Sequence, residues 1–237
     1  MYIFCAPDIN ANNLLPEEES AHCIRVLRKK AGDEIRITDG QGFFYDAHIT
    51  VAHPKHCEIA IDRQEGWVKP WGGDLHLAIA PTKNMERMEW LFEKITELGI
   101  DTITPLLCRY SERKELKTAR LEKIMVSAMK QSQKALLPRL NLPTLFSIFI
   151  EQPFDGEKLI AHCYEGRKKT LKQAYTPKQD AVILIGPEGD FSEEEIALAV
   201  NKGFTSVTLG DSCLRTETAA LFACSAFHLV NSSGGFQ

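Results

Sequence analysis

The stretch AVILIGPEGDFSEEE, residues 181–195, decides the fold class of this chain. Its first five residues form a continuous apolar run, which is typical of a strand that is buried on both faces. The GPEG segment at 186–189 predicts a tight loop, because glycine and proline favour turns. Ser192 and Glu195 have the spacing of a capping box, so a helix is expected to begin there. A buried strand, a tight loop and a helix therefore follow one another directly.

The chain beyond residue 73 repeats this alternation of strand-like and helix-like segments. We expect strands at 75–80, 102–107, 158–162, 181–185 and 206–209, and helices at 85–98, 116–136, 192–201 and 216–230. Gly99 directly follows the first of these helices and predicts its end. Apolar strands that alternate with helices predict an α/β domain with a parallel sheet covered on both faces.

The N-terminal part of the chain has a different residue pattern, with short strand-like segments and turn residues. Residues 34–38 and 43–51 are strand-like and flank the turn sequence DGQG, which predicts a hairpin in a small β-rich domain. A short amphipathic helix is expected over 22–30. The segment GWVKPWGG at 66–73 has neither helical nor strand periodicity, and we interpret it as the domain boundary. The predicted domains are residues 1–70 and 73–237.

Length and composition indicate a folded protein of one or two domains, with 237 residues, of which 44% are hydrophobic and 25% charged. No apolar run approaches the roughly 20 residues that cross a bilayer, and the first residues lack a basic and apolar leader, so we expect a cytoplasmic protein without a membrane anchor. Seven scattered cysteines without a C-x-x-C pair argue against a disulfide framework and a zinc site. His53, His56 and Cys57 lack a fourth ligand, so no metal is expected.

The charge of the chain is unevenly distributed. The net charge is −4, but residues 109–139 contain nine basic and three acidic residues, which gives this segment a charge of +6. The basic residues of the segment are Arg109, Arg113, Lys114, Lys117, Arg120, Lys123, Lys130, Lys134 and Arg139. Such a segment could contact phosphates or could form a solvated helix face, and composition alone leaves both readings open.

A second loop follows the last predicted strand. The sequence VTLG at 207–210 leads into DSCLRTET at 211–218 and then into an apolar helix. In parallel sheets, ligands bind beyond the carboxyl ends of the strands, so this loop and GPEG could hold one ligand together. The chain has neither G-x-G-x-x-G nor G-x-x-x-x-G-K-[ST], which argues against dinucleotide and P-loop sites. A plain turn and a capped helix with an ion pair remain the structural alternatives.

Three motifs, LIGPEG at 184–189, LG at 209–210 and LRTETA at 214–219, resemble those of the RsmE family of SPOUT-class RNA methyltransferases. The resemblance extends along nearly the whole chain, through His22, Val26-Leu27-Arg28, Gly32-Asp33, residues 39–42, Lys83, Arg87-Met88-Glu89, Glu97-Leu98-Gly99, Ile103, Pro105, Gln131-Ser132 and Pro138. Several motifs in the same order make an accidental match improbable.

The resemblance implies a fold and a function. It implies an N-terminal PUA-like β-barrel that binds RNA and a C-terminal SPOUT domain with a trefoil knot. It also implies a homodimer that uses S-adenosylmethionine to methylate N3 of a uridine in 16S ribosomal RNA, as part of the small ribosomal subunit. Knots are very rare in proteins, and periodicity alone could not have indicated one.

The motifs also give candidate site residues. We expect cofactor-binding residues at Ile185, Gly186, Glu188, Gly189, Leu209, Gly210, Cys213, Leu214 and Thr218. Arg215 and Glu217 are the catalytic candidates: a guanidinium can stabilise charge on the uracil, and Glu217 or Glu97 could accept its proton. The RNA-binding candidates are His22, Arg25, Arg28, Lys83, Arg87 and Arg113.

Two other functions stay open from the sequence. Asp190 and Cys213 stand where the family usually has other residues, which is compatible with a ribosome assembly factor that has the fold but no turnover. The third hypothesis is a small-molecule enzyme in which the N-terminal region serves oligomerisation.

Overall fold

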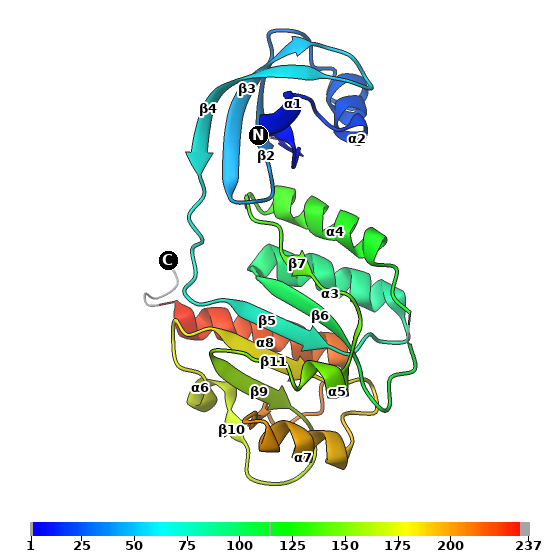
Figure 1. Ribbon diagram of the computed structural model, residues 1–237, viewed down its shortest axis with the longest axis vertical. Coiled ribbons are helices and arrows are strands. Elements are labelled where there is room, and N and C mark those ends of the chain that lie inside the picture. Colours follow the sequence, from blue (N-terminus) through cyan, green and yellow to red (C-terminus); the bar gives the residue numbers. More distant parts are fainter. Residues whose placement is uncertain (1, 114, 233–237) are drawn as a thin grey trace. The chain divides into compact units, whose positions relative to one another are not determined.

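The computed structural model describes residues 2–113 and 115–232, which fold into two units (Figure 1). The first unit extends to Lys69 and also contains Met125–Leu137, while the second contains Pro70–Ile124 and the chain from Pro138 onward. Lys114 of the basic segment lies outside the described residues. Among those described, no helix has the length and apolar character needed to cross a membrane.

A four-stranded sheet with the order β1-β2-β3-β4 forms the first unit. Its strands are β1 (Ile3–Cys5), β2 (Glu34–Thr38), β3 (Phe43–Val51) and β4 (Glu58–Gly66). The antiparallel pairing of β2 with β3 confirms the predicted hairpin. Three short helical segments accompany the sheet: α1 (Ile9–Asn12), α2 (Glu17–Ala21) and a π-helical turn, η1 (His22–Val26). The helix predicted over 22–30 therefore begins and ends earlier, and Arg28 already has a left-handed φ of 55°.

Residues from the middle of the chain complete the first unit. Helix α4 (Thr118–Gln131) continues into it, and Ala135 packs with Ile3 and Phe44 in a small buried cluster. The Gly42 amide donates a hydrogen bond to the carbonyl oxygen of Ala135 over 2.9 Å. The hairpin turn is thus held by a segment distant in sequence.

A parallel sheet forms the second unit, with the order β10-β12-β9-β11-β5-β6-β7 and with β8 paired to β6. The strands are β5 (Leu75–Ile79), β6 (Thr102–Leu107), β7 (Arg139–Leu140), β8 (Thr144–Leu145), β9 (Glu157–Ala161), β10 (Lys169–Thr170), β11 (Ala181–Ile185) and β12 (Thr205–Thr208). Each pairing between described strands of this sheet is parallel, which confirms the prediction from the apolar runs.

Helices cover both faces of this sheet. They are α3 (Met85–Leu98), α5 (Phe146–Phe149), α6 (Leu171–Ala174), α7 (Glu193–Asn201) and α8 (Thr216–Asn231). Val182 and Leu184 of β11 pack in one cluster with Phe146 of α5 and Ala199 of α7. Successive side chains of a strand point to opposite faces of its sheet. Helix α8 lies along β5 and β11, on the face opposite to this cluster (Figure 1). The fully apolar sequence of β11 follows from burial on both faces.

The end of α3 shows why glycine is required there. Gly99 caps the helix with a φ of 118°, in the region that favours glycine. A Cβ at this position would lie 2.6 Å from the Trp71 ring. Both observations confirm the predicted helix stop at Gly99.

Candidate functional site

The carboxyl ends of three neighbouring strands form the floor of a pocket in the second unit. Strand β9 lies between β12 and β11, and its last residue, Ala161, pairs with both Val207 and Ile185. The pocket has a volume of about 560 Å³. Its lining comprises Ala161, His162, Cys163, Lys168, Ile185, Gly186, Pro187, Glu188, Gly189, Asp190, Thr208, Leu209, Gly210, Asp211, Ser212, Cys213, Leu214, Arg215, Thr216 and Ala219. Eight of the nine predicted cofactor-binding residues are in this set.

The loop after β11 is held closely against the helix that follows. A Cβ on Gly186 would lie 3.1 Å from the backbone nitrogen of Phe191, so a larger residue would displace the loop. Ser192 and Glu195 form the capping box predicted from their spacing. Glu188 accepts a hydrogen bond from the Lys83 amide over 2.9 Å, which joins the loop to the segment before α3. The loop therefore has a fixed shape at the pocket.

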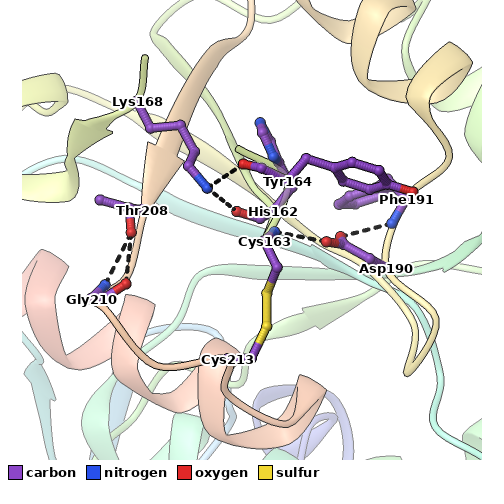
Figure 2. Close-up of a disulfide and its surroundings, with 9 residues drawn as sticks. All are labelled: His162, Cys163, Tyr164, Lys168, Asp190, Phe191, Thr208, Gly210 and Cys213. Atoms are coloured by element: carbon purple, nitrogen blue, oxygen red, sulfur yellow. Dashed lines mark hydrogen bonds between the residues drawn. A yellow bond between two sulfur atoms is a disulfide. The ribbon is translucent and has the colours of Figure 1, made fainter. Parts of the chain in front are cut away.

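Asp190 connects the β11 loop with the end of β9. Its φ is 64°, and its carboxylate accepts hydrogen bonds from the amides of Cys163 over 2.7 Å and Phe191 over 2.8 Å (Figure 2). The backbone after β9 is thus joined to the GPEG loop by a side chain that sequence reasoning did not assign to the site.

The loop after β12 forms another wall of the pocket. The Thr208 hydroxyl donates to the carbonyl oxygen of Gly210 over 2.9 Å, and Gly210 has a φ of 127° (Figure 2). Farther along the loop, Cys213 forms a disulfide with Cys163. The sequence argued against a disulfide framework, and it did not predict this single pair. The sheet order brings together two residues that are 50 positions apart in sequence.

His162 and Lys168 bring polar groups to the pocket that the sequence motifs did not indicate. The Lys168 ammonium donates to the carbonyl oxygens of His162 over 2.9 Å and Tyr164 over 2.7 Å (Figure 2). Both ring nitrogens of His162 are buried without a hydrogen-bond partner among the described residues. Burial, and secondarily the Lys168 charge, lowers the pKa of His162. The imidazole is therefore a neutral group beside the pocket at pH 7.

The start of α8 divides its polar residues between two environments. Arg215, Thr216 and Ala219 line the pocket. Glu217 and Thr218 are outside the lining, because successive helix residues are turned by about 100°. The Glu217 side chain is 9% exposed and lies 3.6 Å from the Arg87 guanidinium of α3. Glu217 therefore joins two helices, and its predicted catalytic role stays a prediction.

The predicted RNA-binding residues are divided between the two units. In the first, Arg25 and Arg28 are exposed, and the His22 ring stacks on Tyr2 with a centroid distance of 4.7 Å. In the second, Lys83 forms an exposed ion pair with Glu112, and Arg113 donates to the carbonyl oxygen of Lys83. Their contact with RNA stays a prediction.

The basic segment at 109–139 is partly neutralised by acidic neighbours. Arg109 pairs with Glu194, Arg120 with Glu89, and Lys130 with Glu19. These ion pairs reduce the charge that the segment can present to phosphates.

The histidines at 53 and 56 stack on each other, with ring centroids 3.6 Å apart. Within the described ranges, no group of three or more His, Cys, Asp or Glu side chains is placed to hold a metal ion.

Comparison with known proteins gives two family matches. A family described as an RNA methyltransferase domain matches residues 69–228, and one described as an RNA methyltransferase PUA domain matches residues 15–62. The fold class predicted from the resemblance, an α/β domain preceded by a PUA-like domain, is thereby confirmed.

Curated relatives match almost the full chain. The chain is 37% identical to ribosomal RNA small subunit methyltransferase E of Mesomycoplasma hyopneumoniae over 94% of this chain and 96% of that protein. It is 31% identical to the protein of the same name from Synechocystis, over 95% of this chain and 75% of the relative.

Solved structures show the same similarity in three dimensions. A probable rRNA-methyltransferase from Porphyromonas gingivalis has a TM-score of 0.94 and 44% identity, and the match covers 98% of this chain and 99% of that one. Ribosomal RNA small subunit methyltransferase E from Neisseria gonorrhoeae, solved with bound S-adenosyl methionine, has a TM-score of 0.83 and 28% identity, covering 97% and 98%.

Proposed function

This chain belongs to the RNA methyltransferase family that includes ribosomal RNA small subunit methyltransferase E, and we propose that it methylates N3 of a uridine in 16S ribosomal RNA with S-adenosylmethionine. One observation carries the proposal: the three motifs at 184–189, 209–210 and 214–219 meet around one pocket. The names of the relatives support the substrate class, and the pocket supports the proposed position of the cofactor.

The lining residues fit S-adenosylmethionine. A volume of about 560 Å³ lies in the range usual for small-molecule sites, about 300–1,000 Å³. When bound, the cofactor supplies a methyl group on a sulfonium. We assign the predicted residues Ile185, Gly186, Glu188, Gly189, Leu209, Gly210, Cys213 and Leu214 to its binding. Thr216, which lines the pocket, replaces Thr218, whose side chain is exposed.

Arg215 is the proposed catalytic residue. Transfer of a methyl group to a ring nitrogen is an in-line displacement, so the enzyme must align the reactants and stabilise the uracil as N3 loses its proton. The Arg215 guanidinium lines the pocket, stays charged and offers planar donors to a carbonyl oxygen. The ion pair of Glu217 with Arg87 holds the first turn of α8 against α3 and so positions Arg215.

Residues 1–70 are proposed to bind RNA, with residues 73–237 as the methyltransferase domain. The PUA match at 15–62 supports this division, and exposed Arg25 and Arg28 supply positive charge in the first unit. Binding to phosphates releases counterions, so removal of these charges would weaken the salt dependence of RNA binding. We further propose a homodimer that acts in the cytoplasm on the small ribosomal subunit. Light scattering of the purified chain would test its oligomeric state.

The test of the proposed function is methyl incorporation into ribosomal RNA. Small subunits from cells that lack the gene are incubated with the protein and S-adenosylmethionine labelled in its methyl group. We expect one N3-methyluridine per 16S molecule, identified by mass spectrometry. Arg215→Ala should abolish the signal, whereas Lys202→Ala, which changes an exposed cation just after α7 and outside the pocket lining, should not. Cofactor binding without methyl incorporation into subunits or naked RNA would instead favour an assembly factor.

A further inference from the structure

The disulfide between Cys163 and Cys213 lies at the proposed cofactor pocket and has no part in the proposed methyl transfer. Both residues line the pocket, and both are exposed. Figure 2 shows the two sulfur atoms joined between the backbone after β9 and the loop that leads into α8. Their Cα atoms are 6.3 Å apart, within the usual range for a disulfide.

The position of this pair in the sheet connects three strand ends. Strand β9 lies between β11 and β12, so Cys163 lies between the two loops that we propose hold the cofactor. Asp190 of the β11 loop accepts a hydrogen bond from the Cys163 amide, and Cys213 belongs to the loop after β12. With the disulfide formed, Asp190, Cys163 and Cys213 connect one loop to the other (Figure 2).

Hydrogen bonds with two side chains, Asp190 and Lys168, hold the backbone around Cys163. Besides the hydrogen bond to Asp190, Lys168 donates to the carbonyl oxygens on either side of Cys163. Each residue from 210 to 213 of the partner loop is exposed. A bond between the two cysteines therefore attaches an exposed loop to a fixed one.

The other five cysteines are shielded from reagents in solution. Cys5, Cys23, Cys57, Cys108 and Cys224 are all buried. Burial raises the pKa of Cys5 to about 11 and that of Cys224 to about 12, and it also raises the pKa of Cys108. Because the thiolate is the reactive form, Cys5, Cys108 and Cys224 exchange slowly with external disulfides. The hydrogen bond from Cys23 lowers the pKa of Cys57, but both residues are buried and so are shielded from such reagents. The pair at the pocket is the accessible one among the seven cysteines, all of which are described.

We propose that Cys163 and Cys213 form a reversible redox switch, in which a low-molecular-weight disulfide oxidises the pair and thereby weakens cofactor binding. The inference rests on the proposed function, because it assumes that the pocket holds S-adenosylmethionine. The reduced dithiol is the binding-competent form, and the disulfide is the inhibited form.

The chemistry is two successive thiol–disulfide exchanges. One cysteine thiolate attacks the small disulfide, which forms a mixed disulfide and releases one small thiolate. The second cysteine thiolate attacks the protein sulfur of that mixed disulfide and releases the second small thiolate. The protein loses two thiol protons and two electrons, and the small disulfide is reduced to two thiols. A small thiol reverses both steps.

We expect the disulfide to oppose binding because it fixes the spacing of the two backbones at one side of the pocket, whose volume of about 560 Å³ describes the disulfide form. A flat ring inserted between them needs about 3.5 Å of contact distance on each face, or roughly 7 Å in total. The disulfide holds the Cα atoms 6.3 Å apart, which is too close to admit such a ring between them. Reduction frees the exposed 210–213 loop to move away from the end of β9 and widens this side of the pocket.

The experiment measures cofactor affinity in both redox states. The full chain is treated with dithiothreitol or with oxidised glutathione, freed of the reagent, and titrated with S-adenosylmethionine in a calorimeter. We expect the oxidised protein to bind at least about tenfold more weakly, with full recovery after reduction. Peptide mass mapping of the same samples should show the Cys163–Cys213 linkage only after oxidation.

Variants test whether Cys163 and Cys213 cause the change in cofactor affinity on oxidation. The double variant with Cys163→Ser and Cys213→Ser should have the same dissociation constant after either treatment, while Cys224→Ala, a buried cysteine of α8, should keep the response of the parent chain. Equal affinity of the parent chain in both states, or a linkage elsewhere such as Cys23 to Cys57, would overturn the switch alone. Absence of binding in both states would overturn the proposed function, and the switch with it.

Discussion

Replacing Gly186 with alanine tests how closely the β11 loop must keep its shape. A Cβ at this position would lie 3.1 Å from the Phe191 nitrogen and 3.2 Å from both the Asp190 carbonyl carbon and Phe191 Cδ2. Two of these atoms are backbone, and Phe191 is fully buried, so neither residue can move away freely. The loop must therefore shift by a few tenths of an ångström. Such overpacking typically costs about 1–3 kcal/mol of unfolding free energy.

The shift acts on the residues that we propose hold the cofactor. If about 1.4 kcal/mol of this overpacking cost acts on the cofactor-binding shape of the loop, S-adenosylmethionine binding should weaken by roughly tenfold. Calorimetric titration measures this change, and denaturant unfolding measures the loss of stability. Gly66→Ala in the first unit is the matched control, because its nearest neighbour would be Phe43 at an ordinary 3.8 Å. A Gly186→Ala affinity within about twofold of the parent chain would refute the reasoning.

Three further changes probe the active site, the core and the pH dependence. Arg215→Ala should lower methyl incorporation by roughly 100-fold or more, and Arg215→Lys should not restore it, since an ammonium lacks the planar donors. Phe227→Ala should lower the unfolding free energy by about 3–5 kcal/mol in denaturant titrations, because this α8 side chain is fully buried. Burial, with a smaller contribution from Arg139, lowers the pKa of His76 from 6.5 to about 4. The folded state therefore takes up this proton later than the unfolded state, and stability present above pH 6.5 should fall as the pH drops towards 4. The loss is on the order of 3 kcal/mol. His76→Gln, which keeps a hydrogen-bonding group near Thr104, should remove this part of the pH dependence.

Local features of the fold could be predicted because local residues determine them. The hairpin of β2 and β3, the capping box at Ser192 and the helix end at Gly99 each follow from a few adjacent residues. The continuous apolar run at 181–185 indicated burial on both faces, which β11 has.

The order of the strands could not be predicted in the same way. No local pattern shows that β9 lies between β11 and β12, and this placement brings His162, Cys163 and Lys168 to the pocket. The disulfide escaped prediction for the same reason, because its cysteines are neighbours only in the folded sheet. Helical periodicity could have separated Thr216 and Ala219 from Glu217, but which side faces the pocket depends on packing against α3.

The most direct test of the proposed cofactor site is a crystal structure of the reduced chain grown with S-adenosylmethionine. We predict density for the cofactor between the GPEG loop and the loop after β12, in contact with the backbone of residues 185–189 and 209–214. A cofactor bound elsewhere, or an empty pocket at saturating concentration, would contradict the assignment.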